Sequence, residues 1–263
     1  MNLRTRVEVR PVTDLAGCAA LDLLFGEVWQ GTAMPLLGTE LLRAFGKAGD
    51  YVAGAYDGDQ LLGGCVAFFG PPPEAELHSH VTGVARAALG RGVGYAIKQH
   101  QLGWARAHGA AAITWTFDPL VARNAYFNLA KLGAVPVEYL TDFYGPMRDR
   151  INGDDPSDRL LVRWDVTAPE PVRADPAGAA VVLDRDRRRG APAGETVLVA
   201  VPEDVESLRT HDPAAAREWR VAVRDVLTGL LAEGARFAGF DRTGGYVLRR
   251  RVAWAGGDAT QRG

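Results

Sequence analysis

The chain has 263 residues, of which 47% are apolar and 24% charged, and its formal net charge is −2. These values exclude a disordered chain, a collagen-like repeat and a small disulfide scaffold. The lack of a strong positive charge also argues against nucleic acid as the main partner.

The N-terminal residues carry no apolar stretch of the kind found in secretory signals, and no run of 18 residues is apolar throughout. Only two cysteines occur, Cys18 and Cys65, and neither suggests a framework of disulfides. We therefore expect a cytoplasmic protein in a reducing compartment, with no membrane partner.

The first predicted elements are a strand at residues 7–12 and a helix that begins after Asp14, a typical N-cap residue. Residues 51–56 and 61–69 are apolar segments separated by a short turn that starts with Asp57 and a glycine. This pattern predicts a β-hairpin.

A third strand is predicted at residues 76–84, followed by a turn with glycines at positions 90, 92 and 94 and a helix that ends near Gly109. The pattern continues with a buried strand, a helix closed by Gly133 and two more strands. These elements are expected at residues 111–117, 124–132, 135–139 and 160–166.

Proline, glycine and charged residues dominate residues 167–195, which predicts a linker. A strand at 196–201 follows, then a long helix capped by Asp212 and closed by Gly234, and a terminal hairpin at 236–240 and 245–250. We expect three parts: a domain at 1–166, the linker at 167–195, and a β-α-β-β extension at 196–263 packed on the same domain.

The turn before the predicted helix at residue 93 has the features of an anion site. Gly92 and Gly94 would leave backbone N–H groups unpaired at a helix N-terminus, where the helix dipole also attracts negative charge. The spacing suits a pyrophosphate, with Arg91 available for a phosphate. A tight strand-to-helix turn without a ligand is an equally good interpretation of the glycines alone.

The context of this turn favours one family. A dinucleotide-binding fold needs a parallel strand before the glycines, whereas here the preceding strands form an antiparallel meander. The order of elements and the loop from Leu89 through Gly90, Arg91, Gly92 and Val93 to Gly94 resemble the GNAT acyltransferase superfamily, although Leu89 replaces a polar residue of the family loop. The resemblance implies an α/β (α+β) fold with a mixed central sheet flanked by helices.

Several longer strings are similar to one poorly characterised branch of this superfamily, known mainly as predicted acetyltransferases. They cover residues 77–81, 114–120, 123–128, 131–134 and 157–164. The resemblance implies an N-acyltransferase that uses acetyl-CoA or another acyl-CoA as co-substrate, needs no metal and acylates a small-molecule amine. A backbone N–H near Val84 would hold the thioester carbonyl. The C-terminal helix could also form a homodimer surface.

Two histidines are the first candidates for a catalytic base. His78 and His80 alternate with Ser79 on the predicted strand and therefore share one face, and an imidazole titrates near neutral pH. A structural histidine is an equally good interpretation of either one. Asp118 is a rival base, with capping of the next helix as its alternative role. No third ligand accompanies the histidines at a persuasive spacing, which argues against zinc.

The candidate acid is less clear, because many relatives carry a tyrosine at the position that Leu129 occupies here. Tyr126, one helical turn earlier on nearly the same face, and Tyr144 are possible replacements, and each could instead be a packed aromatic. Asn124 and Asn128 are four residues apart on the same predicted helix and could contact coenzyme A or substrate.

Lys98 and Gln101 are one turn apart on the central helix and are expected on a solvated face, although Lys98 could reach a phosphate. Cys65 is expected to be buried and inert. A non-catalytic acyl-CoA-binding module is an alternative function, since leucine stands at positions 89 and 129. Acyl-CoA decarboxylation and O-acyl transfer are further alternatives.

Overall fold

The computed structural model describes residues 7–29, 37–72, 75–147, 155–171, 174–242 and 245–250. It divides into two compact units. The first contains residues 1–118 and 134–170, and the second contains residues 119–133 and 171–263. This division differs from the expected one, because the helical segment after Asp118 groups with the C-terminal residues.

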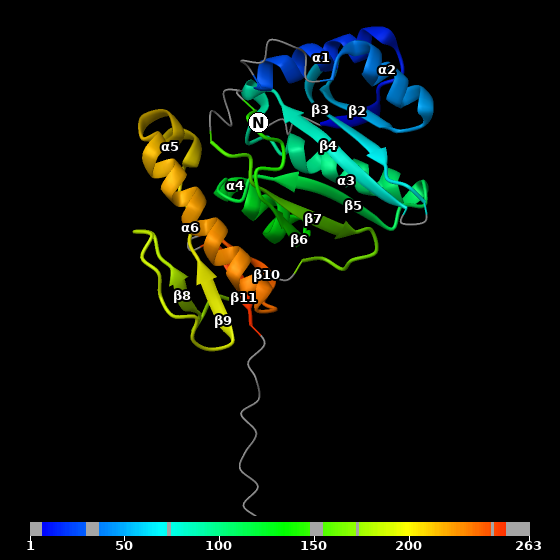
Figure 1. Cartoon of the computed structure of the whole chain (residues 1–263). Helices are drawn as coiled ribbons and strands as arrows, with labels where there is room; N and C mark the ends of the chain where they lie inside the picture. The colour runs from blue at the N-terminus through cyan, green and yellow to red at the C-terminus, as the bar shows by residue number, and fades with distance from the viewer. Residues whose placement is uncertain are drawn as a thin grey trace, which may run out of the picture. The chain divides into compact units, whose positions relative to one another are not determined.

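The first unit contains a mixed seven-stranded sheet in the order β1-β2-β3-β4-β5-β7-β6 (Figure 1). Neighbouring strands are antiparallel except for the pair of β4 and β5, which is parallel. The strands span Glu8–Pro11 (β1), Tyr51–Asp57 (β2), Gln60–Phe69 (β3), Glu76–Val84 (β4), Ala112–Phe117 (β5), Val135–Leu140 (β6) and Arg159–Asp165 (β7).

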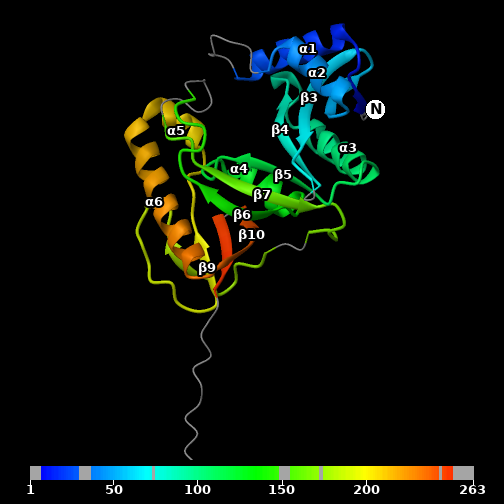
Figure 2. The same ribbon diagram turned by 45° about the vertical axis from the view of Figure 1, so that its right-hand side comes forward.

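Helices cover both faces of this sheet. The surroundings of Gly63 and Gly64 in β3 show this, because side chains at successive positions of a strand point to opposite faces of the sheet. A Cβ on Gly63 would meet Val93 and Ile97 of α3 (Val93–Ala107), whereas a Cβ on Gly64 would meet Leu21 of α1 (Leu15–Trp29). Helix α2 (Thr39–Ala48) packs beside α1, and Phe45 of α2 stacks on Phe68 of β3. Figure 2 shows α1 and α2 across the sheet from α3.

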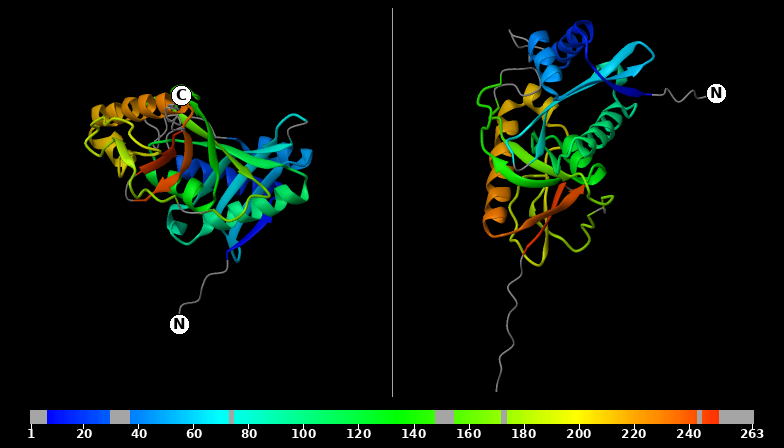
Figure 3. Two further views of the ribbon diagram at one scale, coloured as in Figure 1. Left: turned by 90° about the horizontal axis from the view of Figure 1, so that it is seen from below. Right: turned by 90° about the vertical axis from the view of Figure 1, so that its right-hand side faces the viewer.

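The second unit contains a four-stranded sheet in the order β10-β11-β9-β8. Its elements are α4 (Ala122–Ala125), η2 (Tyr126–Lys131), β8 (Ala180–Leu183), β9 (Thr196–Val199), α5 (Val205–His211), α6 (Pro213–Ala232), β10 (Arg236–Asp241) and β11 (Gly245–Arg249). The long helix α6 packs on β8 and β9, and η2 packs on β10 (Figure 3).

The α/β fold and the order of elements predicted from the sequence are confirmed, with local differences. The sequence reading missed α2, α5 and the strand β8, which lies inside the expected linker. The predicted caps are present: the Gly17 amide donates to Asp14 Oδ1 at 2.7 Å, and the Ala215 amide donates to Asp212 Oδ1 at 3.0 Å. In the part of the chain that is described, no helix is long and apolar enough to cross a bilayer.

Candidate active site

The strands β4 and β5 separate in the middle of the first unit's sheet. They pair only from Glu76 with Ala112 to His78 with Thr114. Beyond that point β4 continues to Val84 paired with β3, and β5 continues to Phe117 paired with β7. The facing edges therefore carry backbone N–H and C=O groups with no strand partner among the described residues, and such groups need hydrogen bonds. The opening lies at the carboxyl ends of both parallel strands, where α/β sheets bind ligands.

The glycine loop follows β4 and leads into α3. Gly90 and Gly92 have φ angles of 77° and 81°, which favour glycine, and a Cβ on either residue would meet nothing within 4 Å. Gly92 is the N-cap of α3, and no side chain caps it. The amides of Val93 and Gly94 donate to no other described residue. The loop therefore presents free amides beside open space at a helix N-terminus.

The side chains of the loop are arranged around these amides. Arg91 forms an ion pair with Asp57 of the β2–β3 turn, with Nη2 at 2.9 Å from Oδ2. Leu89 is 63% exposed, whereas Val93 is buried under the sheet. Val84 pairs with Gly63 as the last residue of β4. The ion pair of Arg91 and the burial of Val93 thus fix the loop, while the amides of Val93 and Gly94 have no partner among the described residues.

The structure brings His78 and His80 together on the face of β4 opposite α3. Their ring centroids are 6.1 Å apart, and both rings pack near Phe68. His80 is the extra residue of a β-bulge in β4. It has no partner in β3, because Ala67 pairs with Ser79 and Val66 pairs with Val81. The shared face expected for the two histidines is confirmed.

Desolvation lowers the pKa of both histidines. For half-buried His78, burial is the main cause, and the charges of His80 and Lys98 add to it. For His80, whose side chain is exposed, desolvation by neighbouring atoms is the cause. A lowered pKa keeps an imidazole neutral at pH 7, which is the form that accepts a proton. His78 Nδ1 also lies 3.3 Å from Thr114 Oγ1 of β5.

The other candidates of the first unit are Asp118, which follows β5, and Tyr144, which follows β6. Asp118 follows β5 and is buried, with only 7% of its surface exposed. It does not cap the next helix, because α4 has Val121 as its N-cap and no side-chain cap. Tyr144 lies between β6 and β7, where its hydroxyl is 3.0 Å from Thr116 Oγ1 of β5. Thr116 and Thr114 share one face of β5, so Tyr144 and His78 contact the same face of that strand.

The remaining candidates belong to the second unit. Residues 126–131 wind as a π-helix, in which the Leu132 amide donates to Phe127 O at 3.0 Å. The wider turn separates the directions of Tyr126 and Leu129, so the expected common face is wrong: Leu129 is buried and Tyr126 is only half-buried. Asn124 is exposed and Asn128 is buried, which also differs from one shared polar face. Tyr126 instead packs against the cations of Lys131 and Arg242.

The expectation for Lys98 and Gln101 is also wrong. Lys98 is 4% exposed and Gln101 is fully buried, because both lie under the sheet and not on a solvated face. The sequence pattern of the helix could not reveal this. The prediction assumes that polar residues of an amphipathic helix face solvent, and a buried polar cluster is an exception to that rule. Among the described residues, no group of three or more His, Cys, Asp or Glu could hold a metal ion.

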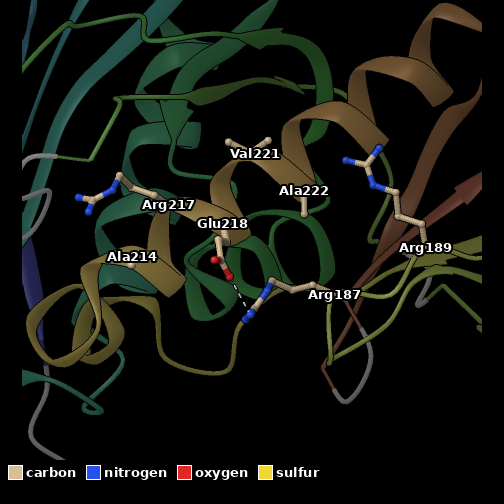
Figure 4. A pocket seen from close by; sticks show the side chains of 7 residues that line it. All are labelled: Arg187, Arg189, Ala214, Arg217, Glu218, Val221 and Ala222. Atoms are coloured by element: carbon tan, nitrogen blue, oxygen red, sulfur yellow. Dashed lines mark hydrogen bonds and ion pairs between the residues drawn. The ribbon is translucent and has the colours of Figure 1, made fainter.

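A pocket of about 590 Å³ lies in the second unit, on one side of α6 (Figure 4). Arg187, Arg189 and Arg217 line it. Two of these arginines form ion pairs with acidic residues of α6: Arg187 with Glu218 at 2.9 Å and Arg189 with Asp225 at 2.8 Å. These pairs offset much of the positive charge that would attract an anion, so the opening of the first unit's sheet is the better candidate.

Comparison with known proteins supports this choice. Residues 18–133 match the family model of the acetyltransferase (GNAT) family. No curated protein sequence matches the chain.

Similar solved structures share the fold at low sequence identity. An N-acetyltransferase from Staphylococcus aureus Mu50 is 12% identical, with a TM-score of 0.52, over 62% of this chain and 99% of that one. A ribosomal-protein-alanine N-acetyltransferase from Brucella melitensis is 17% identical, with a TM-score of 0.51, over 60% and 99%. A proposed acetyltransferase from Salmonella typhimurium, solved with its cofactor acetyl-CoA, is 14% identical, with a TM-score of 0.50, over 65% and 99%.

The family match covers the glycine loop and the separating strands, and the similar structures share the fold of this part of the chain. Residues 18–133 are therefore similar to the acetyltransferase (GNAT) family.

Proposed function

We propose that the protein transfers an acyl group from an acyl-CoA, with acetyl-CoA as the first candidate, to a small-molecule amine. The observation that carries this proposal is the combination in one unit of the open β4–β5 edges and the glycine loop at the N-terminus of α3. The Salmonella typhimurium structure with its cofactor acetyl-CoA supports the choice of co-substrate.

The glycine loop is suited to the pyrophosphate of coenzyme A. The free amides of Val93 and Gly94 and the dipole of α3 favour a negative group, and the open space beside Gly90 and Gly92 leaves room for one. The ion pair of Arg91 with Asp57 offsets part of the arginine's charge but holds its guanidinium near the loop, where it can contact a phosphate. A fixed guanidinium loses less side-chain entropy when a phosphate binds.

The open edge of β4 is suited to the pantetheine arm and the thioester. An extended chain of amides can pair with the unpaired backbone groups of Ser79 to Val84, as an added strand would. A backbone N–H near Val84 would then donate to the thioester carbonyl and stabilise the negative charge that develops on its oxygen.

His78 and His80 are suited to the role of base. In the reaction the amine nitrogen bonds to the carbonyl carbon, the carbon–sulfur bond breaks, the amine loses a proton and the thiolate gains one. A neutral imidazole at this edge can accept the amine proton directly or through a water. Asp118 remains a rival, because it follows β5 at the same end of the opening.

The proposed acid is Tyr144, whose hydroxyl lies 3.0 Å from Thr116 Oγ1 of β5. Tyr126 of the second unit stays as the alternative proposed acid, and Asn124 and Asn128 stay as proposed contacts of coenzyme A or substrate. Since Leu129 is buried and has no proton to give, protonation of the thiolate needs another donor.

Two measurements test this function. Isothermal titration with acetyl-CoA and longer acyl-CoAs should give binding, and no binding at millimolar ligand would contradict the proposal. Thiol release should then be followed with a disulfide reagent on a panel of small amines. A peptide with an N-terminal alanine is added as a comparison from another class of acceptor. Cys18 and Cys65 are both buried, so the protein itself contributes little background.

A non-catalytic acyl-CoA-binding module is the second candidate, favoured by buried Leu129 in place of the family tyrosine. Tight binding without thiol release on the whole panel would support this alternative over transfer.

A further inference from the structure

A buried lysine occupies the point where β4 and β5 separate. Lys98 lies on α3 and is only 4% exposed. Its ammonium Nζ donates to Ser79 Oγ of β4 at 2.8 Å and lies 4.1 Å from the ring centroid of Trp115 on β5. One side chain therefore contacts both of the separating strands.

Ser79 and Trp115, which Lys98 contacts, directly follow the last paired residues of β4 and β5. His78 and Thr114 form the last pair of β4 with β5. Ser79 and Trp115 come directly after them and would form the next pair if the strands stayed together. The ammonium of Lys98 thus bridges the first pair of residues that the opening separates.

Neutral groups surround the ammonium. Besides Ser79 and the Trp115 ring, it donates to Gln101 Oε1 at 3.0 Å. Gln101 Nε2 in turn donates to Cys65 Sγ of β3 at 3.2 Å, and Thr82 Oγ1 of β4 donates to the same sulfur at 3.2 Å. This network connects α3, which carries the glycine loop at its start, to the strands that form the opening.

We infer that Lys98 is a positioning residue: its side chain holds β4 and β5 apart and so fixes the opening that receives the thioester. This inference rests on the proposed acyl-CoA function. A buried charge is costly to desolvate, and a methionine of similar size would fill the same space without that cost. The lysine contributes what methionine cannot, a hydrogen bond to one strand and a cation–π contact with the other.

The charge of Lys98 should depend on pH within an accessible range. Burial lowers its pKa to about 8, and Cys65 of β3 opposes the shift. The other titratable group coupled to it is His78 of β4, on the opposite face of the sheet, whose pKa Lys98 helps to lower. Above pH 8 the neutral amine loses the cation–π attraction, so acetyl-CoA affinity should fall as the pH rises through this value.

Lys98→Met tests the inference, with Lys47→Met as the control, because Lys47 is exposed on α2 of the same unit. We expect acetyl-CoA to bind Lys98→Met about five- to twentyfold more weakly at pH 7. The wild type and Lys47→Met should lose affinity between pH 7 and pH 9.5, whereas Lys98→Met should show a flat profile. Binding is measured without an amine, so titration of the catalytic base does not affect it. Equal affinity and an equal pH profile for Lys98→Met would overturn the inference.

Amide hydrogen exchange without ligand separates the inference from the proposed function. Lys98→Met should change the protection of amides in residues 79–84 and 115–117, and Lys47→Met should not. If the wild type fails to bind acetyl-CoA but the exchange changes as expected, the proposed function fails and the bridging role of Lys98 survives. If the wild type binds and neither affinity nor exchange changes in Lys98→Met, only the inference fails. Ser79→Ala removes the same hydrogen bond and gives a second variant if Lys98→Met does not fold.

Discussion

At the scale of single residues, the proposed chemistry of the candidate site depends on two imidazoles. His78 and His80 lie on the same face of β4, and each has a pKa below the ordinary value for histidine. A base must be neutral to accept a proton, so the lowered pKa values suit the proposed role of these histidines at neutral pH.

The pH dependence of kcat/KM tests this role. We expect kcat/KM to rise with pH and to level off with a midpoint below 6.5, because both pKa values are lowered. Replacing the true base by asparagine should reduce kcat by about 10²- to 10⁴-fold and remove the acidic limb of the profile. His108→Asn is the control, since His108 lies at the end of α3, where its ring stacks on Trp104 and its Nδ1 lies 2.8 Å from the Trp104 carbonyl oxygen. An unchanged rate and profile in both His78→Asn and His80→Asn would contradict the assignment and favour Asp118.

Lys98 also makes a prediction about stability. Its pKa is about 8 in the folded protein and close to 10.5 when unfolded, so the unfolded chain binds more protons between these values. The free energy of unfolding should therefore rise with pH from about 8 to about 10.5 relative to Lys98→Met. Denaturant unfolding of both proteins at pH 7 and pH 10 measures the difference. A free energy of unfolding that stays flat or falls from pH 8 to pH 10, relative to Lys98→Met, would contradict the lowered pKa of Lys98.

At the scale of elements, the start of α3 combines a turn that favours glycine with the proposed phosphate site. Gly92 and Gly109 flank the helix, have φ angles of 81° and 76°, and would place a Cβ in open space. The two glycines therefore form a matched pair in which only Gly92 lies at the proposed phosphate site.

Gly92→Ala and Gly109→Ala should each lower stability by about 1–2 kcal/mol, because alanine is strained at a positive φ. Only Gly92→Ala should also weaken acetyl-CoA binding, since its methyl group would enter the space proposed for the phosphate. Thermal unfolding and calorimetric titration give the two readouts. Equal affinity in both variants would contradict the placement of the pyrophosphate.

Local signals predicted many elements well. The turn at Asp57 fixed the β2–β3 hairpin, and the caps at Asp14 and Asp212 fixed the starts of α1 and α6. The helix α2 was missed because Gly38, with no capping side chain, precedes it. The strand β8 was missed because four residues between proline- and charge-rich segments carry little periodic signal.

The candidate site was predictable only where a local motif encodes it. The glycine loop and the two histidines could be found from spacing along one strand and one turn. Lys98 could not, because its burial depends on β3, β4 and β5 meeting under α3, which is a property of the tertiary structure. The π-helix at residues 126–131 also breaks the α-helical spacing from which the role of Tyr126 was predicted.

At the scale of the whole molecule, the chain carries its proposed acyl-CoA site in the first unit and a separate sheet with α6 in the second. The cap of α6 offers a way to perturb the second unit alone. Asp212→Ala removes the bond to the Ala215 amide and should cost about 1 kcal/mol of stability.

Acetyl-CoA affinity should stay within about twofold of the wild type in Asp212→Ala, because a helix cap costs stability and leaves the folded site intact. Asp186→Ala is the control, since it removes only an exposed ion pair with Arg188 and should change stability little. Thermal unfolding and calorimetric titration check both variants. A large loss of affinity in Asp212→Ala would show that the second unit takes part in binding.

A crystal structure of the complex with acetyl-CoA would show where the first unit binds this ligand. We expect the diphosphate within hydrogen-bond distance of the amides of Val93 and Gly94, with the pantetheine arm along the β4 edge between Ser79 and Val84. A ligand bound at another surface, with the glycine loop unoccupied and the β4 edge unpaired, would contradict the proposed acyl-CoA site.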